Sequence, residues 1–249
     1  MDLPYTLTSD HPTQLGMIVL QSDETLEADM RRLLPVEAEL LVSRVESGTE
    51  LSHDMIAAME DRLTASARLL PRDSRFAAVG YGCTSASAQI GSDRVAARIK
   101  DGAQVAHVTN PVAALIAACR ALEIAKLGLV SPYIASISDR LREVLEEAGI
   151  TVTRFGSFNE PVEANVVRIT EGSLEEAAMV VGAEDACQAV FLSCTNLRTL
   201  DVIPRIEAQL GKPVLSSNQV LAWHLLQLAD IAPVPGAPGA LWDKSGSRE

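Results

Sequence analysis

The chain consists of two halves that repeat one pattern of strands and helices, and this repeat limits the folds open to it. The segment LGMIV at 15–19 resembles LGLV at 127–130. Each precedes a cysteine, Cys83 or Cys194, by almost the same number of residues. Both cysteines follow an apolar run and are themselves followed by threonine. We infer that the chain is a duplication of one α/β unit.

Short apolar runs alternate with helical patterns along the whole chain. We expect strands at 15–20, 38–45, 76–82, 104–108, 126–131, 150–155, 188–193 and 213–216. We expect helices at 24–34, 51–70, 85–100, 111–124, 134–148, 173–186, 197–210 and 218–229. Continuous apolar strands alternating with helices are typical of parallel sheets covered on both faces, so the predicted fold class is α/β. Ligands bind such folds at the carboxyl ends of the strands, and both cysteines lie there.

Length, charge and composition narrow the function classes. The 249 residues, 47% hydrophobic and 22% charged, suffice for two domains that each bury a core. The net charge of −12 argues against nucleic acid as a partner, because phosphate binding needs clustered Lys and Arg. No apolar run reaches the ~20 residues of a membrane span, and the start lacks the features of a signal peptide. We therefore expect no membrane partner and a cytoplasmic location.

Two of the four cysteines are candidates for chemistry. Cys119 lies on an apolar helical face and Cys187 precedes a strand, so we interpret both as structural. The cysteines do not have the spacing of a zinc site, so we expect no metal. Cys83 and Cys194 fall at predicted strand-to-helix turns, where the helix dipole and free N–H groups stabilise a thiolate. We expect them to act together as catalytic acid/base or nucleophilic groups.

Polar residues beside the two cysteines are candidates for substrate binding. Proton transfer at carbon or attack by sulfur creates negative charge, which preorganised hydrogen-bond donors must stabilise. Backbone N–H groups at the two turns can do this. The hydroxyls of Thr84, Ser85 and Thr195 and the amide of Asn196 are further donors.

Several motifs, taken together and in order, resemble the cofactor-independent Asp/Glu racemase superfamily. They are GMIVLQSDETLE at 16–27, GYGCTS at 80–85, VSPY at 130–133, Asn165 and SCTN at 193–196. The most similar branch contains maleate cis-trans isomerase, arylmalonate decarboxylase and the ectoine-utilisation EutA proteins. The resemblance covers residues 14–230 and implies two Rossmann-like domains related by a pseudo-twofold axis, with the active site between them. Residues 1–115 plus 216–249 would carry Cys83, and residues 116–215 would carry Cys194.

The resemblance also implies a reaction type and further site residues. In the racemases one cysteine thiolate removes the α-proton and the other thiol delivers one, without metal, pyridoxal phosphate or nucleotide. In maleate isomerase the first cysteine instead adds to the double bond. Arylmalonate decarboxylase keeps only the second cysteine, so the pair in this chain argues against that activity. Tyr133 and Asn165 match positions that hold the substrate carboxylate.

Asp23 departs from the maleate isomerase pattern, which has asparagine there. A carboxylate facing a dianion would be repelled by several kcal/mol in a dry site. Asp23 would suit an ammonium group, as in an amino acid or an N-acyl diamino acid of ectoine breakdown. The alternative is that Asp23 only caps the helix expected at 24–34. Glutamate racemases have histidine where this chain has Asn196, which argues against that activity.

These observations leave three functions open. We expect a cofactor-independent two-cysteine isomerase acting on a small carboxylate by proton transfer at the α-carbon. The alternatives are maleate cis-trans isomerisation through Cys83 and non-catalytic binding of a small carboxylate. Exposed helix layers and the Pro/Gly-rich tail at 231–249 lead us to expect a homodimer or higher homo-oligomer. The tail either packs across a neighbouring copy through Leu241 and Trp242 or is disordered.

Overall fold

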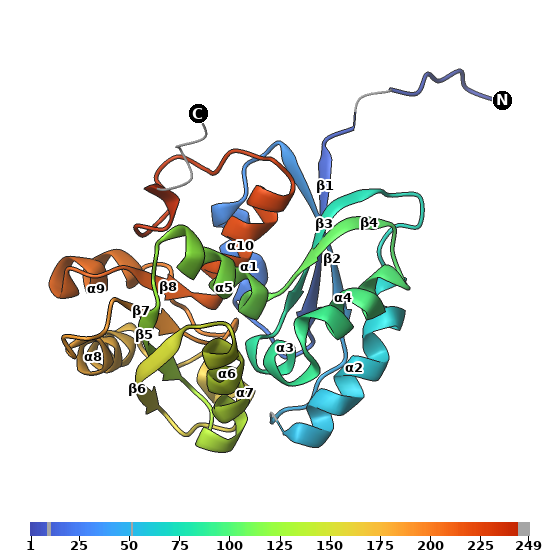
Figure 1. The fold of residues 1–249 in the computed structure, drawn as a ribbon. Helices are drawn as coiled ribbons and strands as arrows, with labels where there is room; N and C mark the ends of the chain where they lie inside the picture. The colour runs from blue at the N-terminus through green and yellow to red at the C-terminus, as the bar shows by residue number, and fades with distance from the viewer. Residues whose placement is uncertain (9–10, 51, 244–249) are drawn as a thin grey trace.

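The computed structural model describes residues 1–8, 11–50 and 52–243, which form two four-stranded parallel sheets (Figure 1). The first sheet has the order β2-β1-β3-β4 and the second has the order β6-β5-β7-β8. The strands of the first sheet are β1 (Thr13–Leu20), β2 (Ala38–Val45), β3 (Phe76–Gly82) and β4 (Val105–Thr109). Those of the second are β5 (Lys126–Ser131), β6 (Thr151–Ser157), β7 (Ala189–Leu192) and β8 (Val214–Ser216). The identical strand order confirms the predicted α/β class and the repeat.

The helices connect and cover the strands. Those of the first half are α1 (Leu26–Leu33), α2 (His53–Ala67), α3 (Thr84–Ile90), α4 (Ser92–Lys100) and α5 (Pro111–Ala121). Those of the second half are α6 (Ala135–Glu147), α7 (Glu163–Val166), α8 (Glu171–Gly182), α9 (Ile203–Leu210) and α10 (Ser217–Leu228). Helix α10 returns to the first half, where it packs against α1, α5 and β3. This packing supports the proposed division into residues 1–115 plus 216–249 and residues 116–215.

Two predicted helices differ from the structure for local reasons. The helix expected at 85–100 is divided into α3 and α4 at Gly91, whose φ of 90° is a conformation that favours glycine. The helix expected at 197–210 begins only at Ile203, where Pro204 occupies the first turn. Helix α7 was not predicted, because its single turn is too short to show a hydrophobic period.

The Pro/Gly-rich tail packs against its own chain as far as Asp243, which corrects the expectation that it covers a neighbour or is disordered. Leu241 and Trp242 are buried. The Gln219 side chain donates to the Pro238 carbonyl at 2.7 Å, and the backbone N–H of Ala240 donates to the carboxylate of Glu207 at 3.1 Å. Residues 244–249 of the predicted tail lie outside the described residues.

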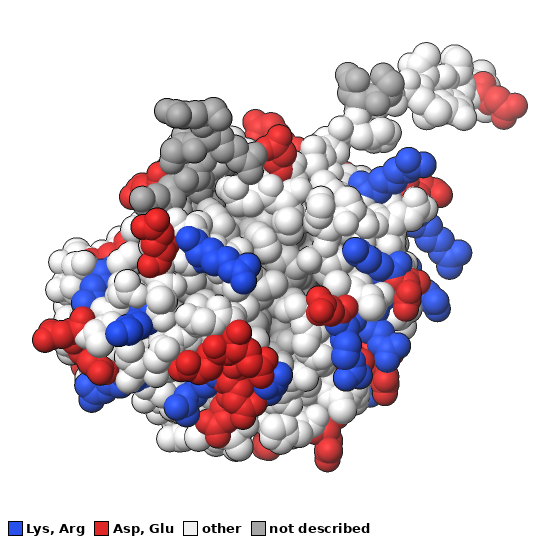
Figure 2. Space-filling view, in the orientation of Figure 1, with Lys and Arg blue, Asp and Glu red and all other residues white. Residues whose placement is uncertain are grey.

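The surface carries charges of both signs. Figure 2 shows acidic and basic side chains on one face, with an acidic cluster at the lower centre. Helix α6, which lies in that part of Figure 1, exposes four acidic residues, Asp139, Glu143, Glu146 and Glu147. Within the described ranges, no helix is both long enough and apolar enough to cross a membrane.

Glycines in the central strand of each sheet leave room for side chains that pack closely against it. A Cβ added to Gly128 in β5 would lie 2.4 Å from Val181 Cγ1 and 3.1 Å from the Val181 carbonyl oxygen. Gly16 occupies the matching position in β1, and a Cβ there would lie 2.7 Å from Val79 Cγ2. The repeated glycines therefore have a packing role in the central strands.

We expect Gly128→Ala to lower the free energy of unfolding by about 1–3 kcal/mol, because the added methyl group overpacks the sheet against α8. The matched control is Gly172→Ala. Gly172 lies in the first turn of α8, where an added Cβ meets no atom within 4 Å. It should leave stability unchanged or raise it by up to about 1 kcal/mol. Urea unfolding followed by circular dichroism measures both. Equal changes in the unfolding free energy of the two variants would show that the close approach of α8 to Gly128 does not affect stability.

Candidate active site

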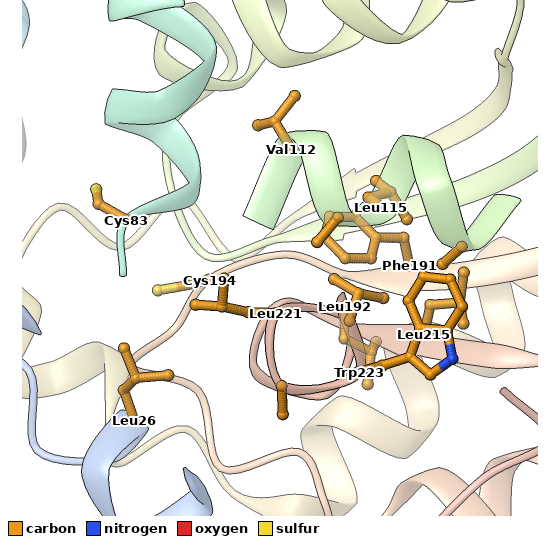
Figure 3. Packing of buried hydrophobic residues seen from close by; sticks show 14 of the residues in the cluster. Leu26, Cys83, Val112, Leu115, Phe191, Leu192, Cys194, Leu215, Leu221 and Trp223 are labelled. Atoms are coloured by element: carbon orange, nitrogen blue, oxygen red, sulfur yellow. The ribbon is translucent and has the colours of Figure 1, made fainter. Parts of the chain in front are cut away.

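The carboxyl ends of β1, β3, β5 and β7 meet at one buried pocket between the two sheets. Loops that follow these strands supply most of its lining, as expected for parallel α/β folds. The pocket is lined by Leu20, Asp23, Cys83, Thr84, Ser85, Tyr133, Glu163, Cys194, Thr195 and Asn196. The structure thus brings together every predicted site residue except Asn165. Figure 3 shows Cys83 and Cys194 at the edge of the apolar cluster, on segments from the two halves.

The pocket is narrow. The space open to the centre of a water molecule is about 10 Å³, which is about the volume that one ordered water requires. A small carboxylate is larger than this. Substrate entry therefore requires the lining side chains, or the two halves, to move apart.

Cys83 lies at the N-terminus of α3, where its sulfur accepts a hydrogen bond from the backbone N–H of Ala86 at 3.4 Å. The thiol is only 4% exposed. Burial raises its pKa to about 12, and the Ala86 hydrogen bond offsets this only in part. The prediction that the helix terminus favours the thiolate is therefore wrong for this closed pocket, because the desolvation of Cys83 raises its pKa more than the hydrogen bond at the helix terminus lowers it.

Cys194 lies in a turn, not at the predicted helix N-terminus. Its φ of 135° is rare for a residue with a side chain and marks local backbone strain. The sulfur lies 3.1 Å from Tyr133 Oη and accepts a hydrogen bond from the backbone N–H of Asn196 at 3.3 Å. Burial again raises the pKa of the thiol, and the carboxylate of Glu163 raises it further. Both thiols are therefore protonated at neutral pH in this state.

Glu163 is a site residue that sequence reasoning missed. It opens the one-turn helix α7 and is only 3% exposed. Its Oε1 accepts a 2.6 Å hydrogen bond from Tyr133 Oη, and its Oε2 accepts one from Asn196 Nδ2 at 3.1 Å. Burial raises the pKa of this carboxyl, which the two hydrogen bonds oppose. No sequence signal distinguished it from the other acidic residues of a chain with 33 of them.

Asn165 does not reach the pocket. It lies two residues after Glu163 in α7, on the exposed side, and its backbone N–H donates to the Val162 carbonyl at 2.9 Å. The predicted contact between Asn165 and a substrate carboxylate is corrected accordingly. Glu163 is the residue that α7 directs toward the cysteines.

The two carboxylate oxygens of Asp23 have different surroundings. Oδ1 accepts hydrogen bonds from the backbone N–H groups of Thr25 at 2.8 Å and Leu26 at 2.7 Å, so it caps the start of α1. Oδ2 is buried and has no hydrogen-bond partner among the described residues. Burial raises the pKa of Asp23, whereas the two backbone hydrogen bonds, the Thr195 side chain and the Arg44 guanidinium lower it. Asp23 therefore caps a helix and also lines the pocket with one oxygen unpaired.

The hydroxyl groups connect the two halves around the pocket. Thr84 Oγ1 lies 2.8 Å from Ser217 Oγ, which accepts a hydrogen bond from the backbone N–H of Cys194 at 2.9 Å. Thr195 Oγ1 donates to the Gly82 carbonyl at 3.3 Å. Ser85 lines the pocket. Ser217 was not predicted as part of the site, because it belongs to α10 and follows neither of the strands that end at the cysteines.

The pocket lining is acidic in composition. It contains two carboxylates and no Lys, Arg or His. Among the residues the structure describes, no group of three His, Cys, Asp or Glu is arranged to hold a metal ion. The chemistry open to this lining is proton transfer or nucleophilic attack by sulfur.

The doubled α/β fold, with two cysteines in one pocket at the strand ends, defines the class: an α/β enzyme with the fold of solved maleate isomerase and arylmalonate decarboxylase structures. The chain belongs to the arylmalonate decarboxylase family, whose model matches residues 15–242.

Known proteins similar to this chain carry two different activities in their names. This chain is 28% identical to the arylmalonate decarboxylase of Bordetella bronchiseptica, over 86% of this chain and 90% of that protein. It is 22% identical to the maleate isomerase of Pseudomonas putida, over 92% of this chain and 96% of that one. A Nocardia farcinica maleate cis-trans isomerase variant with a covalently bound succinylcysteine intermediate has a similar fold. Its TM-score is 0.82 at 22% identity, over 92% of this chain and 98% of that one.

We expect the stability of the protein to fall more steeply above pH 9 than that of Cys83→Ser. The folded state holds the Cys83 proton with a pKa of about 12, against 9.0 for an unperturbed thiol, so it binds more protons than the unfolded state in this window. Between pH 8 and about pH 10.5 the protein should lose about 2 kcal/mol more unfolding free energy than Cys83→Ser does. Denaturant titrations of both proteins at several pH values measure it. Parallel pH curves would contradict the raised pKa.

Proposed function

We propose that this chain is a cofactor-independent isomerase of a small carboxylate in which Cys83 and Cys194 transfer protons at the α-carbon. The observation that carries the proposal is that both cysteines, one from each half, line one pocket. When ionised, one cysteine removes the α-proton, and the electron pair of the C–H bond moves into the carboxylate as an enediolate. The other thiol then gives its proton to the carbon and becomes the thiolate.

The lining supplies donors for the charge that develops on the substrate. We assign this role to Thr84 and Ser85, with the backbone N–H groups of the two cysteine turns. The Thr195 hydroxyl donates to the Gly82 carbonyl, so it would have to give up that bond to join them. The Asn196 amide is committed to Glu163 and to the backbone N–H of Glu24, so its role is to position the site. Tyr133 reaches Cys194 and is proposed to contact substrate.

We propose further that the substrate carries an ammonium group, as an amino acid or an N-acyl diamino acid does. The support is the unpaired Asp23 Oδ2 in a pocket whose lining has two carboxylates and no cationic side chain. A dianion would meet repulsion from both carboxylates, while an ammonium group would be attracted. A role in ectoine breakdown fits this chemistry and remains part of the proposal.

Maleate cis-trans isomerisation is the second candidate, favoured by the relatives that carry that name. In this reaction the Cys83 thiolate adds to the double bond, the resulting single bond rotates, and elimination gives fumarate. The succinylcysteine intermediate named for the Nocardia protein is an adduct of this kind. The decarboxylase activity named for the Bordetella relative is less well supported, because the first-half cysteine is present here.

We also propose a homodimer or higher homo-oligomer. The described N-terminal arm extends from β1 (Figure 1) and exposes Met1, Leu3, Tyr5 and Leu7 at alternate positions. An extended segment with alternating apolar residues is suited to packing on a second copy of the chain.

Proton NMR in D2O tests the reaction. The purified protein is mixed with maleate, aspartate, glutamate, diaminobutyrate and N-acetyl diaminobutyrates. We expect one amine-bearing compound to lose its α-proton signal, and Cys83→Ser and Cys194→Ser each to slow this loss by at least about a hundredfold. Fumarate formation without such exchange would favour the second candidate. Binding without turnover of any compound would instead indicate a non-catalytic binding protein.

Asp23→Asn tests the ammonium group. The amide keeps an oxygen for the N–H groups of α1 but removes a negative charge from the pocket, so kcat/KM for maleate should rise by about tenfold or more. Activity on an amine-bearing substrate should fall by a similar factor. Asp29→Asn is the matched control, because Asp29 is buried nearby and bound by Asn218 but does not line the pocket. Unchanged or lower maleate activity in Asp23→Asn would contradict the ammonium contact and leave helix capping as the role of Asp23.

A further inference from the structure

A continuous chain of hydrogen bonds joins the Cys194 thiol to a buried carboxylate. Tyr133 Oη donates its single proton to Glu163 Oε1 at 2.6 Å. The contact between Cys194 Sγ and Tyr133 Oη at 3.1 Å then has the thiol as donor and the phenol oxygen as acceptor. The order of donation therefore runs from Cys194 through Tyr133 to Glu163.

We propose that Glu163 receives the proton of the Cys194 thiol through the Tyr133 hydroxyl, and so forms the Cys194 thiolate inside the closed pocket. The S–H bond breaks and its electron pair stays on sulfur, while the proton joins Tyr133 Oη. The original Tyr133 proton moves to Glu163 Oε1. The three side chains carry one negative charge before and after the transfer. The inference rests on the proposed function in one respect: the Cys194 thiolate formed in this way is the base that removes the α-proton in the proposed reaction.

The pocket needs an internal proton acceptor because its thiols are hard to ionise. Burial raises the pKa of both cysteines, and the narrow pocket holds little water to carry a proton away. Glu163 is itself buried, and burial raises its pKa toward the range of a base that is active at neutral pH. Once formed, the thiolate keeps the hydrogen bond from the backbone N–H of Asn196 at 3.3 Å.

Neighbouring groups hold Glu163 in the acceptor position. Asn196 Nδ2 donates to Glu163 Oε2 at 3.1 Å, which leaves Oε1 directed to Tyr133. The backbone N–H of Glu163 donates to the Thr49 carbonyl at 3.0 Å and so ties α7 to the first half. The titratable groups that face Glu163 across the pocket are Asp23, Cys83, Cys194 and Tyr133.

Cys83 lacks such an acceptor, although it also has a tyrosine neighbour. Tyr81 lies close enough to lower the pKa of the Cys83 thiol. The Tyr81 hydroxyl donates to the thioether of Met59 at 3.9 Å, and a thioether cannot hold a proton at neutral pH. The resting enzyme is therefore asymmetric: Cys194 is the residue that becomes the base, and Cys83 keeps its proton as the acid.

The test is the pH dependence of alkylation by iodoacetamide, read at Cys194 by mass spectrometry in a Cys83→Ala background. A thiolate formed by internal transfer leaves the net charge unchanged, so its amount does not depend on pH. We expect a rate that is flat within about twofold between about pH 7 and 8. With Glu163→Gln added, the proton must leave to solvent, and the rate should rise about tenfold per pH unit. Tyr133→Phe should give the same slope and is the second variant if Glu163→Gln fails to fold.

The matched control reads Cys83 in a Cys194→Ala background. Its alkylation should rise about tenfold per pH unit with either Glu163 or Gln at position 163, because no relay serves it. The proposal is overturned if Cys194 shows the steep slope already with Glu163 present, or if both variants keep a flat profile.

The outcome for the relay is separate from that for the proposed function, because alkylation requires no substrate. A flat Cys194 profile that Glu163→Gln makes steep supports the relay even if no carboxylate in the panel is turned over. Turnover that requires both cysteines, combined with a steep Cys194 profile in the presence of Glu163, upholds the proposed function and overturns the relay.

Discussion

The hydrogen bonds of Asn196 are the interactions on which the rest of the site depends. Its Oδ1 accepts from the backbone N–H of Glu24 in the first half, at 2.9 Å. Its Nδ2 donates to the backbone oxygen of Glu163 at 3.2 Å and to its Oε2 at 3.1 Å. Its own N–H reaches Cys194 Sγ, and its carbonyl accepts from Thr25 Oγ1 at 3.0 Å. One buried amide thus fixes the distance between the halves, the position of α7 and the environment of one thiol.

Burial gives the site its geometry and also its main chemical difficulty. Exclusion of water strengthens the polar contacts around the cysteines, but the same desolvation raises the pKa values of both thiols. Asp23 and Glu163 share this environment and place two carboxylates in one small pocket. Such a site is expected to favour a substrate whose positive charge compensates them, and to handle protons internally because solvent is remote.

The two halves have the same strand order but different chemistry at the matching cysteine. Cys83 begins a helix, whereas Cys194 lies in a turn with positive φ and contacts Tyr133. The repeated unit supplies two thiols at equivalent strand ends, and the different loops around them make them unequal. Inequality of this kind suits a reaction in which one group starts as base and the other as acid.

The sequence by itself determined the repeated α/β pattern, most strand bounds and the pocket residues beside the two cysteines, because apolar periodicity and strand-end position are local properties. Asp23 and Tyr133 were identified only through the family resemblance. The sequence could not assign Glu163, since its importance comes from contacts with Tyr133 and Asn196 that are distant along the chain. It also favoured Asn165, which α7 turns toward solvent. Only the tertiary structure decided that the thiols are protonated, because desolvation depends on everything packed around them and not on the helix that follows.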